Sequence, residues 1–216
     1  MRLSRTLESH QIRRAGAAAM LGGLLWIPYG VFEMLKPWGV DTVYRDDRGY
    51  ELVTDSLLYW VYNLPGSLAL FLSTLGLLGA FTMPGLSSGR TGGLSRILVY
   101  TALTLAVLSV VGVVTQFDPL FTAPRIFGTL ALGTATFLAG VNAHRAGAAP
   151  VWTISLLALG LLGLFLLPLW PLVHAIEVMP ESGGAGIIAL FGLGWGLLGH
   201  RIRSRPSLAA SSSPSR

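Results

Sequence analysis

The chain has 216 residues, of which 52% are hydrophobic and only 12% are charged. Soluble domains carry about 25% charged residues, so a soluble fold of this composition would leave extensive apolar surface in water, and we expect lipid to be its solvent. The formal net charge of +5 then marks the cytoplasmic side of a membrane protein and not a nucleic-acid site. The absence of cysteine excludes disulfides, cysteine nucleophiles and thiolate-held metal or iron–sulfur centres.

The apolar residues form runs close to the length of about 20 that crosses a bilayer as a helix. We predict six spans, at residues 15–35, 57–81, 95–117, 124–144, 151–173 and 183–199. The fold class is therefore an all-α polytopic membrane protein, with an arm at residues 1–14, a bundle at 15–200 and a disordered tail at 201–216. The first run lacks a small-residue cleavage site, so we expect it to be retained as an anchor.

The loop after the first predicted span is the only predicted outer loop long enough for structure of its own. Residues 43–45 and 50–52 alternate apolar and polar side chains, and they flank a tetrapeptide that ends in Gly49. This pattern is typical of a β-hairpin. An irregular loop lying on the lipid headgroups is the alternative, and the sequence does not separate the two.

Basic residues predict the orientation. Eleven of the fifteen fall in the termini and the loops of one side, and four fall on the other side. Since cytoplasmic loops carry the excess of lysine and arginine, we expect a multi-pass protein of the plasma membrane with both termini cytoplasmic. Most of the acidic residues then lie on the outer side.

Two polar residues stand out within the first two predicted spans, where an ionisable group costs roughly 2.5–3.5 kcal/mol and is a functional candidate by default. Glu33 lies near the end of the first span, so it is either an interfacial residue that pairs with Lys36 or a buried functional carboxylate. Asn63 lies in the second span beside Pro65, which we expect to break the helix locally. Its amide either bonds a neighbouring helix or lines a cavity.

Further polar side chains lie at the outer ends of later spans. Thr122 to Pro124 reads as the start of the fourth helix. Asp118 and Arg125 bracket this short segment, and we expect them to pair with each other or to meet headgroups. His174 and Glu177 have the i,i+3 spacing of paired metal ligands, but a zinc site needs three or four. We expect a solvated turn there and no metal.

The sequence gives little support for a cofactor. His144 and His200 end two spans on the inner side and could in principle ligate a haem, but membrane haem ligands lie deeper and arginines follow both histidines. The sequence contains no nucleotide-binding loop and no hydrolase or metalloprotease motif. We therefore expect no cofactor and no catalytic residue.

Most of the polar span residues share one position, the outer ends of the helices. If the protein binds a small polar ligand, we expect a cavity there. The alternative is that these residues are polar because span ends are solvated. The candidate residues are Glu33, Asn63, Gln116, Asp118, Arg125, His174 and Glu177.

The last predicted span is rich in glycine. Gly192 and Gly196 form a GxxxG motif, with Gly194 between them, and such motifs allow helix backbones to approach closely. Packing within the bundle is the first interpretation, self-association the second and a groove for lipid the third. Expected partners are therefore membrane lipids and either a second copy or a larger membrane complex, and no nucleic acid.

Three functions remain open at this point. The absence of deep charges and catalytic motifs favours a non-enzymatic accessory, scaffold or lipid-interacting bundle. The polar residues at the outer ends would suit a transporter for an ion or small molecule, with a cavity open to the outer face. A membrane-embedded metal or haem redox subunit is the third hypothesis.

Overall fold

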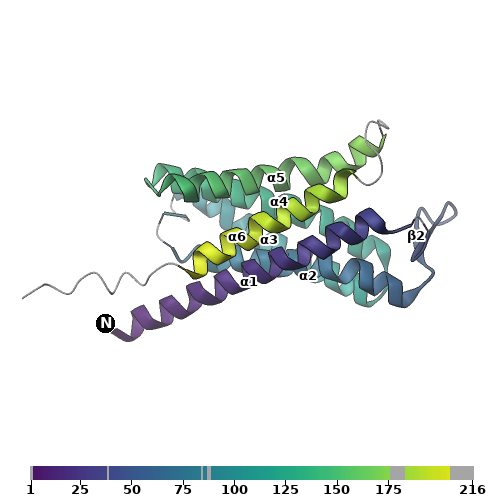
Figure 1. The fold of residues 1–216 in the computed structure, drawn as a ribbon, viewed down its shortest axis with the longest axis horizontal. Coiled ribbons are helices and arrows are strands. Elements are labelled where there is room, and N and C mark those ends of the chain that lie inside the picture. Colours follow the sequence, from purple (N-terminus) through teal and green to yellow (C-terminus); the bar gives the residue numbers. More distant parts are fainter. Residues whose placement is uncertain (1, 38, 84, 87–88, 176–182, 205–216) are drawn as a thin grey trace, which may run out of the picture.

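The computed structural model describes residues 2–37, 39–83, 85–86, 89–175 and 183–204, with side chains described from His10 onward except at 166–175 and 183–185. The described chain is helical apart from a two-stranded hairpin near one end of the molecule (Figure 1). The elements in chain order are α1 Arg2–Leu35, β1 Thr42–Arg45, β2 Tyr50–Val53, α2 Ser56–Ala80, α3 Gly89–Val114, α4 Asp118–Arg145, α5 Pro150–Ala175 and α6 Gly183–Arg203.

Within the described residues, four helices are long and apolar enough to cross a membrane. They are His10–Leu35 in α1, Ser56–Ala80, Gly89–Val114 and Asp118–Arg145. In α5 the apolar stretch Pro150–Phe165 is shorter. Large apolar side chains such as Leu24, Ile97 and Leu197 lie exposed on the outside of the bundle. The structure is thus a helical bundle with one hairpin, in which four helices are compatible with crossing a membrane by length and composition. The bundle itself buries only part of its apolar surface.

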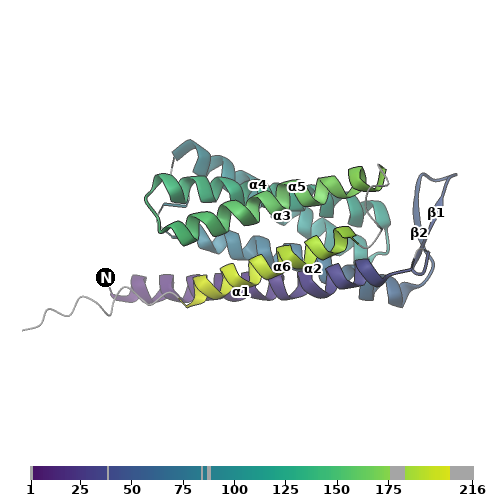
Figure 2. The ribbon, with the colours of Figure 1, turned by 45° about the horizontal axis from the view of Figure 1, so that its top comes forward.

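The helices run roughly along the long axis of the molecule as packed neighbours (Figures 1 and 2). Helix α1 packs against α2 and α6, and α4 packs against α3 and α5. The N-terminus and the end of α6 lie at one end of the bundle, and the hairpin lies at the other (Figure 2). We call these the terminal end and the hairpin end.

The hairpin expected as one alternative in the first loop is confirmed. Strands β1 and β2 are antiparallel and pair Thr42 with Val53 and Arg45 with Tyr50. A hydrogen bond closes the turn: the Arg45 carbonyl accepts the backbone N–H of Gly49 at 2.9 Å. Gly49 has a φ of +70°, a left-handed conformation that glycine adopts without steric cost.

Two expected helix boundaries were wrong. Helix α1 begins at Arg2, so residues 2–14 continue the first helix instead of forming a separate arm. Helix α4 begins at Asp118, four residues before the expected start. Its cap is Phe117 in an extended conformation, and a proline occupies its first turn, a position where the missing N–H costs nothing. The local break expected at Pro65 is also absent, because α2 continues through it. Most of the tail, residues 205–216, lies outside the described residues.

Helices α1 and α6 approach each other closely through glycines on both sides. A Cβ atom on Gly23 of α1 would lie 2.3 Å from the backbone nitrogen of Gly196, and one on Gly199 would lie 2.3 Å from the nitrogen of Met20. Gly192 also faces α1, and Gly194 faces Leu159 of α5. The three predicted packing glycines therefore face in different directions. Gly192 faces α1, Gly194 faces α5, and a Cβ on Gly196 would meet nothing within 4 Å.

Candidate functional site

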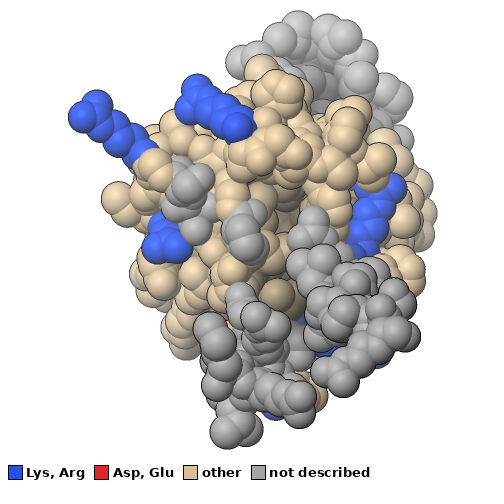
Figure 3. All heavy atoms as spheres, turned by 90° about the vertical axis from the view of Figure 1, so that its left-hand side faces the viewer, with Lys and Arg blue, Asp and Glu red and all other residues tan. Residues whose placement is uncertain are grey.

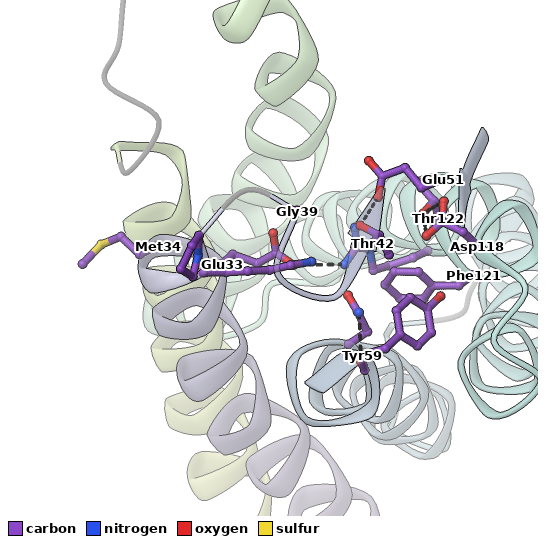
Figure 4. Close-up of a pocket in the computed structure, with 13 residues that line it drawn as sticks. Glu33, Met34, Gly39, Thr42, Glu51, Tyr59, Asp118, Phe121 and Thr122 are labelled. Carbon is purple, nitrogen blue, oxygen red and sulfur yellow. Dashed lines mark hydrogen bonds and ion pairs between the residues drawn. The ribbon is translucent and has the colours of Figure 1, made fainter. Parts of the chain in front are cut away.

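The hairpin end of the bundle contains a cavity of about 230 Å³ (Figure 4). Its walls come from the end of α1 and the loop after it, from both strands of the hairpin, and from α2 and α4. The residues lining this hairpin-end cavity are Glu33, Met34, Lys36, Pro37, Gly39, Thr42, Glu51, Tyr59, Asn63, Asp118, Phe121, Thr122 and Arg125.

Four of the seven residues expected at an outer cavity line this one. They are Glu33 from α1, Asn63 from α2, and Asp118 and Arg125 from α4. Gln116 is not among the lining residues, and its amide oxygen accepts a hydrogen bond from the Ser56 hydroxyl at 3.1 Å. The remaining two candidates, the His174 side chain and Glu177, lie outside the described residues.

Arg125 is held against α1 by an ion pair and two aromatic rings. Its Nη1 lies 3.7 Å from Oε1 of Glu33, and the two side chains are only 16% and 21% exposed. The guanidinium carbon lies 4.3 Å from the ring centre of Phe121 and 5.0 Å from that of Tyr29, both within the range of a cation–π contact. Gly66 of α2 makes room for the Tyr29 ring, because a Cβ there would lie 2.8 Å from it.

The expected ion pairs were therefore wrong in their partners. Glu33 pairs with Arg125 and not with Lys36, although the helical spacing favoured Lys36. Lys36 follows the last residue of α1 and reaches instead to Asp41, at 2.7 Å. Asp118 does not pair with Arg125, because they lie seven residues, about two helical turns, apart along α4 and Arg125 reaches across to Glu33 of α1 instead.

Asp41 joins the loop, the hairpin and α2. Its side chain is fully buried, binds Lys36, and accepts a hydrogen bond at 3.2 Å from Nδ2 of Asn63. The same Asn63 amide donates to the carbonyl of Tyr59 at 2.9 Å, and the Asp41 carbonyl accepts the N–H of Thr54 at 2.8 Å. Asn63 therefore bonds the loop and its own helix as well as lining the cavity.

Two carboxylates of the cavity have hydroxyl partners only. Asp118 accepts the Thr122 hydroxyl at 3.2 Å, and Glu51 accepts the Thr42 hydroxyl. In the part of the chain that the structure describes, no lysine, arginine or histidine forms an ion pair with either carboxylate. Both carboxylates line the same cavity, and Figure 4 shows the Glu51 carboxylate directed toward Thr42.

Tyr59 contributes a hydroxyl without a partner. The residue is completely buried, and its hydroxyl makes no hydrogen bond of good geometry within the described structure, although the Asp118 carboxylate lies near it. Its ring packs edge-on against Phe121, with ring centres 6.0 Å apart. The hydroxyl is directed toward Phe121 and the Asp118 side of the cavity (Figure 4), and its charged neighbours are Asp118, Asp41 and Glu51.

Several of these residues were not predicted to belong to the site. Asp41 and Glu51 come from the acidic outer loop, where nothing in the sequence distinguishes them from Asp46 or Asp47. Tyr59 looks like an ordinary aromatic residue at the end of a span. The hairpin brings Glu51 over the bundle, so the hairpin pattern was the one sequence signal that could have placed Glu51 in the site.

The two ends of the bundle differ in charge. Around the hairpin-end cavity, Glu33, Asp41, Glu51 and Asp118 outnumber Lys36 and Arg125. The view onto the terminal end shows arginine side chains and, among the described residues, no acidic ones (Figure 3). A second cavity of about 310 Å³ is lined there by Gly89, Arg90, Thr91, Asn142, Arg145 and Ala146. Both of its arginines are exposed.

Metal and haem sites have little support in the described part of the chain. No group of three histidine or acidic side chains lies there in a position to hold a metal ion. His144 and His200 are both exposed, which does not suit ligands that must enclose a haem edge. The hairpin-end cavity is suited instead to binding a small polar molecule through charged and hydroxyl groups.

Comparison of the chain with protein-family models, curated proteins and solved structures gives no match.

Proposed function

We propose that this protein is a six-span protein of the plasma membrane, with both termini cytoplasmic and the hairpin outside. Four helices of spanning length support the membrane location. The basic terminal end and the acidic hairpin end support the orientation, because arginine and lysine accumulate on the cytoplasmic side. Lipid then covers the exposed apolar faces of the bundle.

The natural absence of cysteine allows a direct test of this topology. Asp47→Cys, Ala146→Cys and Ser204→Cys each place one thiol at an exposed position. A membrane-impermeant maleimide added to intact cells should label only the first variant, and should label all three after the membrane is opened. Five proposed spans separate Asp47 from Ser204, so the two positions should lie on opposite sides of the membrane. Labelling of Ser204→Cys in intact cells would contradict this topology and the proposed orientation.

We further propose that the protein binds a small polar solute in the hairpin-end cavity. The observation that carries this proposal is that two buried polar groups on its wall lack hydrogen-bond partners: Nη1 of Arg125 and the hydroxyl of Tyr59. An unsatisfied buried polar group costs about 1–3 kcal/mol. Arg125 is ion-paired with Glu33 but its Nη1 makes no hydrogen bond. Polar groups that lack hydrogen bonds beside a cavity are groups that a bound molecule would satisfy.

The residues farther along the bundle are packed and buried, so they are consistent with a binding site at the hairpin end and not with an open pore. Tyr29 and Trp26 lie one and two turns farther along α1 from Glu33, are almost completely buried, and pack edge-on with ring centres 5.9 Å apart. Leu70 of α2 is also fully buried. We therefore place the solute at the outer end, where it enters from outside, and regard passage through the bundle as a separate step.

Blocking the cavity tests solute binding. Thr122→Phe adds a ring on the cavity wall, and Thr104→Phe adds the same ring at an exposed position of α3. A panel of small polar solutes is screened by the thermal unfolding of the full chain in nanodiscs, since a ligand that binds only the folded state raises the midpoint. A binding solute should stabilise the wild type and Thr104→Phe but not Thr122→Phe. Equal stabilisation of all three proteins, or of none, would contradict the proposal.

A further inference from the structure

The hairpin-end cavity has an excess of negative charge that its own residues do not neutralise. Its two cations are both engaged: Lys36 binds Asp41 at 2.7 Å, and Arg125 faces Glu33 at 3.7 Å. The Asp118 and Glu51 carboxylates remain, each with a threonine hydroxyl and no cation in the described structure. Two carboxylates on the wall of one cavity, each partly removed from water, are costly unless a positive charge lies near them.

A third acceptor lies at the same place. The Tyr59 oxygen is buried without a hydrogen bond of good geometry, and its charged neighbours are Asp118, Glu51 and the Asp41 carboxylate that binds Lys36. A hydroxyl carries two acceptor lone pairs beside its one donor. The two carboxylates and this oxygen are therefore three acceptors from three different elements, β2, α2 and α4, on the wall of one cavity.

We propose that the solute bound in the hairpin-end cavity is a small primary amine, whose ammonium group lies between Asp118, Glu51 and the Tyr59 hydroxyl. This inference rests on the proposed solute binding and names the class of solute. A primary ammonium has three N–H donors, one for each acceptor. Its positive charge would compensate the two carboxylates, and the Phe121 ring edge-on to Tyr59 gives the site an apolar wall for the carbon chain.

The residues favour an amine over the other ligands that such a cavity would admit. A metal ion is disfavoured because, within the described residues, no three histidine or acidic side chains are placed to hold one. A simple anion would find Arg125, but it would also meet Glu33, Glu51 and Asp118 on the same walls. A quaternary ammonium has the right charge but no N–H group to donate to Tyr59.

The test compares chloride and sodium salts of small probes on the full chain in nanodiscs. Ethylammonium chloride should raise the unfolding midpoint saturably, whereas tetramethylammonium chloride, magnesium chloride and sodium acetate at the same ionic strength should not. Asp118→Asn should weaken ethylammonium binding about tenfold or more, because it removes a carboxylate that pairs with the ammonium. Tyr59→Phe removes a hydroxyl that makes no hydrogen bond in the protein, so it should fold normally and bind ethylammonium several-fold more weakly.

Asp46→Asn is the matched control, since Asp46 is an exposed carboxylate on the hairpin turn and should leave binding unchanged. Equal or better stabilisation by tetramethylammonium, magnesium or acetate would overturn the primary-amine inference, and the proposed solute binding would stand. Ethylammonium binding that survives both Asp118→Asn and Tyr59→Phe would also overturn it. If every probe and every solute of the wider panel fails to bind, the proposed function fails as well.

Discussion

The Glu33 carboxylate of α1 and the Arg125 guanidinium of α4 lie 3.7 Å apart, although the two residues are far apart in the sequence. Helices α1 and α4 each pack mainly against other helices of the bundle. The pair therefore links two groups of helices at the hairpin end. Because both side chains are largely buried, each carries a desolvation cost that the other offsets.

Loss of both partners of this pair should destabilise the protein by less than the sum of the two single losses. Arg125→Gln leaves Glu33 buried without a cation, and Glu33→Gln leaves Arg125 with its aromatic contacts only. We expect each single variant to lower the free energy of unfolding by about 1–3 kcal/mol, below the 3–5 kcal/mol of a fully buried pair. The double variant should cost less than the sum of the two. Unfolding by denaturant in detergent micelles, arranged as a double-mutant cycle, measures the coupling; additive effects would mean that the two charges do not interact.

Asp41 should be the residue that holds the hairpin over the bundle. Asp41→Ala removes the partner of Lys36 and the acceptor of the Asn63 amide, so we expect the loop and hairpin to detach locally. Limited proteolysis should then cut the segment 39–53 several-fold faster while the helices stay protected. Asp46→Ala, at an exposed position of the same loop, should leave the cleavage rate unchanged. Unchanged cleavage of Asp41→Ala would mean that backbone hydrogen bonds alone hold the hairpin.

Asp47 should titrate at a lower pH than an ordinary aspartate. Nε of Arg45 donates a hydrogen bond to its carboxylate at 2.9 Å, and this bond lowers the pKa of Asp47 from the usual 3.8. A lowered pKa gives stability that is present above pH 3.8 and is lost as the pH falls through the folded value. The pair is exposed, so the effect on overall stability should be too small to measure. The titration of the Asp47 side-chain carbon by NMR should return to the ordinary pKa in Arg45→Gln, and an unchanged titration would contradict the bond.

The sequence was sufficient for the class of fold because hydrophobic length and turn chemistry are local properties. The apolar runs correspond to the helices, and the alternation on either side of a turn ending in Gly49 corresponds to the hairpin. Helix starts were less predictable. Thr122 and Pro124 carry the chemistry of a helix start, but Phe117 and Pro119 provide another one four residues earlier.

The site was predictable only in part because its partners are set by packing. Glu33 and Asn63 stand out as polar residues in apolar spans, and both line the cavity. Lys36 is three residues from Glu33, yet it pairs with Asp41, because the loop after α1 turns back toward α2. No local rule predicts that Arg125 lies between the Tyr29 and Phe121 rings, because the contact needs the space that Gly66 leaves for Tyr29.

The glycines of α6 should differ in their tolerance of a methyl group according to the direction each one faces. A Cβ on Gly199 would lie 2.3 Å from the Met20 nitrogen, whereas one on Gly196 would meet nothing within 4 Å. We expect Gly199→Ala to separate α1 from α6 and to lower the free energy of unfolding by about 1–3 kcal/mol, as overpacking does. Gly196→Ala should be neutral or stabilising by up to about 1 kcal/mol, because alanine is the better helix former.

Thermal unfolding of the two variants, combined with their oligomeric state by light scattering in detergent, separates packing within the bundle from self-association. If α6 packs on α1 of the same chain, Gly199→Ala loses stability and keeps the oligomeric state of the wild type. If the glycine face instead joins two copies, the variant dissociates while its helices remain folded. Equal behaviour of Gly199→Ala and Gly196→Ala would contradict the close approach of α1 and α6, since an added Cβ meets a neighbouring backbone only at Gly199.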